Sequence, residues 1–206
     1  MTQEQRLQAF RAKYPNKTLA LKGAEWKYRI CGDGAQPLLV MPGGELVNDM
    51  DFDLVAALAP RFRIVYPAYP RVQSLGDLAD GVYRILEVEN ITRTWVLGAP
   101  AGELPFWRSY MNDLFGSQLS KADVMANLRI QLEYHERYRF APQDLKDWPG
   151  KIFVIESDND IFNAERRKAL RETYPQAPVH TFHGAGHAPA FSRANEYLEV
   201  LGRMLS

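Results

Sequence analysis

Two residues that act together in acid–base chemistry stand in turns that follow apolar runs of this sequence. Asp160 ends the run "KIFVIESDND", and His187 lies in "HGAGH", the turn after the next apolar run. A histidine held by a carboxylate can take a proton from a nucleophile or from water. The turn "GAPAG" at 98–102 has the spacing of a nucleophile turn, but its central residue is Pro100, which has no hydroxyl. The pair therefore predicts a proton acceptor without the usual nucleophile.

Strand-like and helical segments alternate along the chain and must position these turns. The strand-like segments are 25–31, 37–44, 63–67, 94–100, 151–157 and 179–186. The helical segments are 3–13, 52–62, 75–91, 164–175 and 194–205. Such alternation predicts an α/β fold, with a mostly parallel sheet and helices on both faces. Ligands of such sheets bind beyond the carboxyl ends of the strands, where the Gly43-Gly44 turn also lies.

Residues 103–149 interrupt the alternation. Two helical patterns, "LPFWRSYMNDLFG" and "SKADVMANLRIQLEYHERYRF", fill this segment, and no strand-like run separates them. The segment predicts a short helical cover in place of a strand and its helix. We therefore expect the strand at 151–157 to pair directly with the one at 94–98.

The order of these turns resembles the α/β-hydrolase superfamily, in which a nucleophile elbow precedes an acid and then a histidine. The resemblance covers roughly residues 20–206. The stretches "FRIVYPAYP", "LRETYPQAPVHTF" and "GAGHAPAFSRANEYLEVL" are most similar to the maspardin-related branch. The resemblance implies that Pro100 occupies the nucleophile position, Asp160 the acid position and His187 the base position. Gly43, Gly44 and Ala101 are then the candidates for the oxyanion hole.

Two departures from the family pattern bear on function. Proline fixes φ near about −65° and cannot adopt the strained positive-φ conformation of an elbow serine, so its ring also disturbs the Ala101 N–H. The family places an elbow helix, a further strand and a lid between the elbow and the acid, whereas here 103–149 resembles only the lid side. The chain thus resembles a single hydrolase-like domain, 1–206, that lacks one strand and part of the lid region. Residues 103–149 are then a short helical lid-like segment of this domain.

These departures predict a catalytically degenerate hydrolase relative that acts as a binding or interaction module. Its partner would be a small acyl-type ligand or a protein, and the resemblance implies no cofactor. The alternative is an active hydrolase of ester or related acyl substrates that uses His187 and Asp160 without the usual serine.

Simpler interpretations of the same residues stay open. His187 could be a loop histidine held by backbone contacts, and Asp160 could cap the helix that follows it. Cys31, at the end of an early strand that we expect at the sheet edge, Ser109 and Ser157 are possible nucleophiles, but none stands in an elbow motif.

A metal site is also open to consideration because carboxylates and histidines gather near the last two strands. The candidates are Asp158, Asp160, His180, His183 and His187. His180 and His183 are an odd number of residues apart and should face opposite sides of a strand, so we expect no metal.

Composition excludes some classes of function. Lys and Arg total 25 and Asp and Glu total 25 among 206 residues, so no excess of positive charge favours nucleic acid as a partner. Cys31 is the only cysteine, and we find neither a signal peptide nor an apolar run long enough to span a membrane. We expect a soluble, cytoplasmic protein.

In "LEYHERYRF" we expect a helix that packs Leu132 on the core, with nucleotide or partner stacking as the alternative.

Overall fold

The computed structural model describes residues 1–42, 47–98, 113–114, 116, 119–138, 141–145, 147–160 and 164–205. The chain divides into two compact units, Met1–Glu136 and Arg137–Ser206, and each is described by itself. Within the described part of the chain, no helix is both long and apolar enough to cross a membrane.

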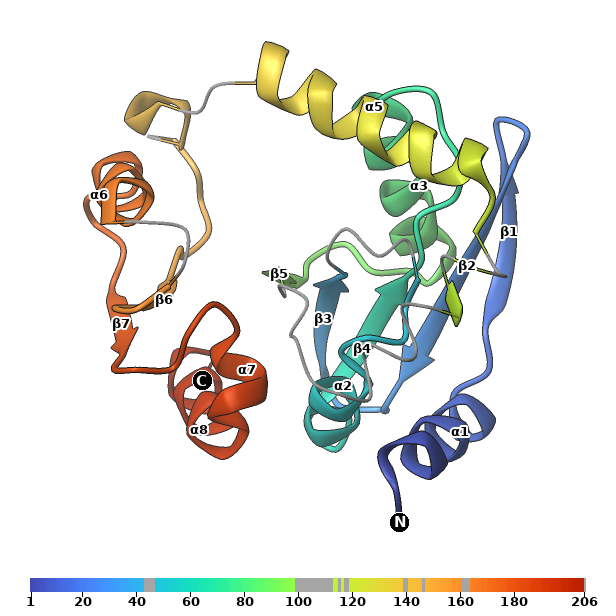
Figure 1. The fold of residues 1–206 in the computed structure, drawn as a ribbon, viewed down its shortest axis with the longest axis horizontal. Coiled ribbons are helices and arrows are strands. Elements are labelled where there is room, and N and C mark those ends of the chain that lie inside the picture. The colour runs from blue at the N-terminus through green and yellow to red at the C-terminus, as the bar shows by residue number, and fades with distance from the viewer. Residues whose placement is uncertain are drawn as a thin grey trace. The chain divides into compact units, whose positions relative to one another are not determined.

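The first unit is built on a five-stranded sheet (Figure 1). Its strands are β1 (Lys17–Leu21), β2 (Ala24–Cys31), β3 (Gln36–Met41), β4 (Phe62–Pro67) and β5 (Trp95–Gly98), in the spatial order β1-β2-β4-β3-β5. β3 runs parallel to β4 and β5, whereas β2 runs antiparallel to both β1 and β4. The parallel centre agrees with the predicted fold class. The hairpin that adds β1 was not predicted.

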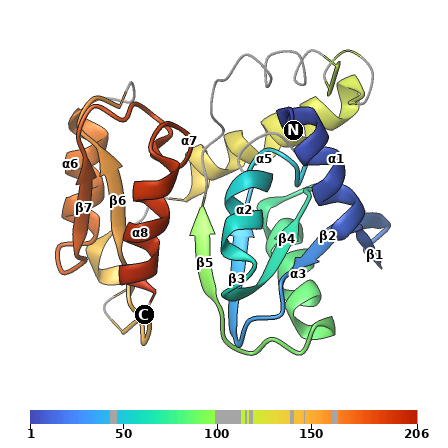
Figure 2. The same ribbon diagram turned by 90° about the horizontal axis from the view of Figure 1, so that it is seen from below.

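Helices cover both faces of this sheet (Figures 1 and 2). The helices α1 (Gln3–Lys13) and α2 (Phe52–Leu58) lie on one face, where the rings of Phe10 and Phe52 are 5.8 Å apart. On the other face, α3 (Leu75–Val88) packs its Val82 and Ile85 against Trp26, and Ile130 of α5 (Lys121–Arg137) joins the same apolar cluster. Each helix therefore contributes an apolar side to the core.

Local sequence signals explain where the first helices begin. Thr2 and Gln5 form a reciprocal capping box at the start of α1, so the predicted helix at 3–13 is confirmed. The Ser74 side chain accepts from the Asp77 N–H at the start of α3.

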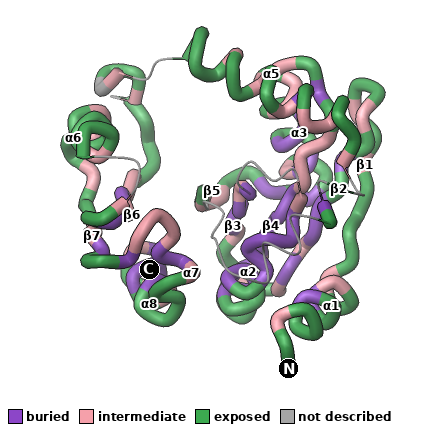
Figure 3. Tube along the Cα trace, viewed as in Figure 1, coloured by how far each residue is buried: buried purple, intermediate pink, exposed green. Residues whose placement is uncertain are grey.

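Two sequence-based expectations about the first unit are wrong. β2 lies between β1 and β4, so Cys31 ends an interior strand and is fully buried, not at the sheet edge. The helix predicted from "LEYHERYRF" is present as part of α5, but Leu132 is 60% exposed and does not pack on the core. Figure 3 shows α5 as mostly exposed. The other helix predicted in 103–149, at 104–116, lies almost entirely outside the described residues.

The second unit contains a parallel pair of strands, β6 (Val154–Ser157) and β7 (Val179–Phe182). A 3-10 turn (Pro142–Leu145), α6 (Ala164–Thr173), α7 (Pro189–Ser192) and α8 (Ala194–Met204) complete it. The Phe182 ring stacks on Tyr197 of α8, while Arg171 of α6 pairs with the buried Glu156. The pairing expected between 151–157 and 94–98 would join the two units and stays a prediction.

Candidate active site

The predicted acid and histidine meet in the second unit. Asp160 lies three residues beyond β6 and His187 five residues beyond β7, and the two strands are parallel. Parallel strands present their carboxyl ends at one edge, which brings the two loops together. The His187 Nδ1 atom is 3.0 Å from Asp160 Oδ1, and the side chains are 35% and 21% exposed. The contact predicted from the sequence is confirmed.

Two glycines give the histidine loop its shape. Gly184 has φ of 67° and Gly186 has φ of 73°, a region that residues with a Cβ rarely adopt. These two turns carry the chain from the end of β7 to His187. The spacing of glycines in "HGAGH" is thus a structural requirement for placing the histidine beside Asp160.

Asp158 holds the beginning of the same loop. Its Oδ1 accepts from the Gly184 N–H at 2.8 Å, and its Oδ2 lies 2.8 Å from His183 Nδ1. The Gly184 N–H, followed by the contact with His183, lowers the pKa of the Asp158 carboxyl below its usual value. A carboxylate therefore anchors the loop across the pH range in which most proteins are stable.

Asn159 holds the middle of the loop. Its Oδ1 accepts from the Gly186 N–H at 2.7 Å and from the Ser157 hydroxyl at 2.9 Å. Residues 158–160 therefore contact the histidine loop at three successive points, and Asn159 contacts the residue directly before His187. The sequence analysis missed the role of Asn159, although its place between two acidic residues and the matching "HGAGH" spacing are visible in the sequence.

Replacing Asn159 by alanine is expected to loosen this loop next to the histidine. The Gly186 N–H loses its acceptor, so its hydrogen exchange should accelerate roughly two- to tenfold, which corresponds to the usual net value of about 0.5–1.5 kcal/mol. Asn159→Asp keeps an acceptor oxygen and should retain protection. The Gly184 amide, bound by Asp158, is the internal reference in the same exchange measurement by NMR. Equal protection of Gly186 in both variants would contradict the assignment.

The geometry of the pair defines its chemistry. A neutral imidazole that directs Nδ1 at a carboxylate carries its proton on Nδ1, which leaves the lone pair on Nε2. This tautomer is inferred from the hydrogen bond. Such a ring can accept a proton at Nε2, and the carboxylate stabilises the imidazolium that results.

The other predicted site residues lie outside the described residues. These are Pro100 at the nucleophile position and the oxyanion-hole candidates Gly43, Gly44 and Ala101. Ser109 lies outside them as well. The structure thus brings Asp160 and His187 together, and the catalytic roles of these two residues and of the other four stay predictions.

The alternative nucleophiles within the described residues are not suited to the task. Cys31 is fully buried, and burial raises the pKa of its thiol to about 12, so the reactive thiolate is scarce. Ser157 is 2% exposed and donates its hydroxyl to Asn159.

The metal candidates do not form a cluster. No group of three or more histidine, cysteine, aspartate or glutamate side chains is arranged for a metal ion in the part of the chain that the structure describes. The His180 ring packs edge-on against Phe182, with 4.7 Å between centroids.

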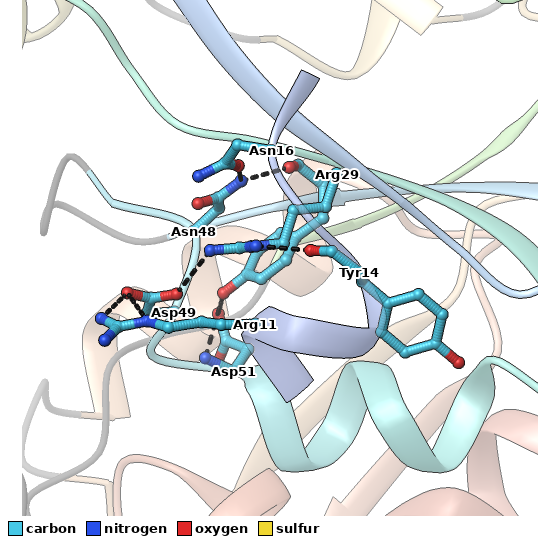
Figure 4. Close-up of polar contacts among 8 residues, drawn as sticks. Arg11, Tyr14, Asn16, Arg29, Asn48, Asp49 and Asp51 are labelled. Carbon is cyan, nitrogen blue, oxygen red and sulfur yellow. Dashed lines mark hydrogen bonds and ion pairs between the residues drawn. The ribbon is translucent and has the colours of Figure 1, made fainter. Parts of the chain in front are cut away.

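A buried ionic network fixes residues 48–51, which follow β3 (Figure 4). Asp49 accepts from the buried Arg29 at 3.1 Å and also pairs with Arg11 of α1. The Asn48 amide donates to the Tyr66 carbonyl at 2.8 Å and to Asn16 at 2.9 Å. This segment after β3 is therefore held by α1, β2 and β4 together.

No protein-family model and no curated protein sequence matches the chain. Solved structures do match it. An E-2-(acetamidomethylene)succinate hydrolase aligns with a TM-score of 0.68 at 12% identity, over 93% of this chain and 99% of its own. The naproxen esterase of Bacillus subtilis aligns with a TM-score of 0.66 at 11% identity, over 98% and 96% of the two chains.

A bacterial membrane phospholipase A aligns with a TM-score of 0.71 at 14% identity, over 98% of this chain and 91% of its own. These structures have the α/β-hydrolase fold. At such low identities the likeness establishes the fold alone. The predicted fold class is therefore confirmed.

Proposed function

We propose that this α/β-hydrolase-fold protein binds a small acyl-type ligand or a protein partner without serine-dependent hydrolysis. The observation that carries the proposal is Pro100, which stands at the nucleophile position of a chain that still pairs His187 with Asp160. The acid and base persist, but the group whose proton they would take is missing from the sequence. The protein is then a degenerate member of a hydrolase lineage.

Proline at the nucleophile position removes more than the serine hydroxyl, because its ring also restricts the backbone conformation. Its ring holds φ near about −65° and biases Ala99 towards an extended conformation. An elbow nucleophile needs a strained conformation with positive φ, which also aims the following N–H at the oxyanion. We therefore infer that Pro100 removes both the nucleophile and the Ala101 N–H as an oxyanion donor.

We also infer that the protein derives from the maspardin-related branch of the superfamily. The stretches quoted above resemble the maspardin-related branch, and the segment 103–149 is too short to hold an elbow helix, a strand and a full lid. We assign 1–206 to one hydrolase-like domain that has lost these elements. The structural neighbours include a hydrolase, an esterase and a phospholipase, which favours an acyl compound as the ligand class.

A second function, water activation by His187, is favoured by the 3.0 Å contact with Asp160. A histidine in this tautomer can act as a general base without any serine. Turnover of a panel of activated acyl esters separates the two functions. If the unaltered protein hydrolyses an ester and His187→Ala abolishes this activity, His187 acts as a general base. If the unaltered protein and His187→Ala give equal rates, the binding function is supported.

The rescue variant Pro100→Ser is expected not to restore esterase activity. It returns a hydroxyl and access to positive φ, but backbone strain of about 1–3 kcal/mol persists only where the surroundings enforce it. We infer from its length and sequence pattern that the segment 103–149 lacks the elbow helix and strand that would do so, and Pro105 restricts where a helix can begin.

The measurement is hydrolysis of p-nitrophenyl acetate by Pro100→Ser and by Pro100→Ser combined with His187→Ala. Equal rates, both at the level of the unaltered protein, are expected. A rate that rises in the first variant and vanishes in the second would show that the proline alone silences an otherwise competent site.

A further inference from the structure

Helix α5 has a second apolar side, which is exposed to solvent. On its inner side, Ala126 is buried and Ile130 packs against the apolar cluster of the first unit. On the opposite side, Met125, Leu128 and Leu132 are 48%, 45% and 60% exposed. An α-helix turns by about 100° per residue, so these three side chains lie on one line, about half a turn around the helix from the buried pair.

Polar contacts near both ends of α5 fix which side is covered. Arg71 donates through Nε and Nη2 to Asp123 Oδ1 at 3.0 and 2.9 Å. Near the other end, Glu133 accepts from the Leu75 N–H at 2.9 Å. The helix cannot rotate to cover its outer side without breaking these contacts. Scattered exposed apolar residues are ordinary, whereas a continuous line of large ones indicates an interaction surface.

A charged residue stands at each end of this apolar line. Lys121 precedes it and Glu136 follows it, and both are exposed. Neither takes part in an ion pair with another residue of the described ranges. The steps along the line are four, three, four and four residues, which keeps all its members on one side of the helix. The outer stripe consists of Lys121, Met125, Leu128, Leu132 and Glu136.

The outer stripe is complementary to itself when two copies meet in opposite directions. In an antiparallel pairing, Lys121 of one copy faces Glu136 of the other at both ends of the contact. Met125 then faces Leu132, and Leu128 meets its counterpart at the centre. A parallel pairing would instead place lysine against lysine and glutamate against glutamate, which is unfavourable. The pattern therefore fits a two-fold axis beside Leu128, the symmetry of most protein dimers.

We infer that the outer stripe of α5 docks antiparallel on the same stripe of a second copy of this chain. The helix has 17 residues and is about 25 Å long, so the contact is smaller than the roughly 800 Å² per partner of stable complexes. The dimer is therefore weak and forms at high protein concentration. The stripe contains neither His187 nor Asp160, so this inference does not depend on the proposed function.

Sedimentation equilibrium of the full chain tests the contact. Between about 10 μM and 1 mM protein we expect a monomer–dimer equilibrium, with a dissociation constant on the order of 100 μM. Leu132→Gln should weaken it at least about tenfold, because each dimer loses two apolar contacts. Leu170→Gln changes a leucine of α6 that is 38% exposed and should leave the constant unchanged. A monomer at every concentration, or a dimer that Leu132→Gln does not weaken more than Leu170→Gln, would overturn the inference.

A charge exchange tests the antiparallel pairing. Lys121→Glu should weaken the dimer roughly two- to thirtyfold, the range for two exposed ion pairs. The double variant Lys121→Glu/Glu136→Lys restores opposite charges at both ends and should return the dissociation constant to that of the unaltered protein. Both side chains are exposed, so the fold tolerates the changes. A double variant that dimerises no better than Lys121→Glu would overturn the inference.

Discussion

Replacing Asp49 by alanine is expected to lower the free energy of unfolding by about 3–5 kcal/mol. Asp49 is 6% exposed and is the carboxylate partner of Arg29, which is 4% exposed. The variant leaves the Arg29 guanidinium buried without that partner, and desolvation of an unpaired charge dominates the cost. Urea denaturation measures the change.

An exposed ion pair between α1 and α2 provides a matched control. Asp53 pairs with Arg6 at 3.0 Å, but the two side chains are 45% and 43% exposed, so Asp53→Ala should cost less than about 1 kcal/mol. The double variant Arg29→Met/Asp49→Leu removes both charges and should recover most of the loss. If Asp49→Ala costs no more than Asp53→Ala, the buried pair is not a main anchor of the segment after β3.

Replacing Gly81 by alanine is expected to destabilise the protein by about 3 kcal/mol or more, although alanine is the better helix former. Gly81 is in α3, and a Cβ there would lie 1.9 Å from Cζ2 of Trp26. Trp26 is 1% exposed and packed in the centre of the apolar cluster, so its ring has little room to move.

Gly76→Ala in the same helix separates packing from helix propensity. The nearest atom to a Cβ at Gly76 is Ser74 Oγ at 3.6 Å, which is an ordinary contact. This variant should be neutral or more stable by up to about 1 kcal/mol. Thermal unfolding of the two variants side by side provides the comparison. A Gly81→Ala protein as stable as Gly76→Ala would mean that the sheet and α3 are not in close contact at this point.

The sequence by itself determined the elements whose causes are local. The capping residues Thr2 and Gln5 mark the start of α1, and the alternation of strands and helices indicated the α/β class. It also indicated that Asp160 and His187 meet, since loops that leave neighbouring parallel strands gather at one edge.

The edge hairpin shows why one strand escaped prediction. β1 is short and largely exposed, so its residues lack a strong apolar pattern. Its turn has φ of 49° at Lys22 and 78° at Gly23, a geometry that the dipeptide Lys-Gly signals only weakly. The pairing of β1 with β2 is also what makes β2 an interior strand.

Only the tertiary structure decided which polar groups are partners. Arg29 and Asp49 are 20 residues apart, and Glu133 binds the first N–H of α3 from 58 residues away. No periodicity encodes such contacts, because they depend on how elements that are distant in the chain pack. The same holds for α5. Amphipathic spacing identifies a helix with two sides, but the neighbours decide that Ala126 and Ile130 are covered while Leu128 and Leu132 are exposed.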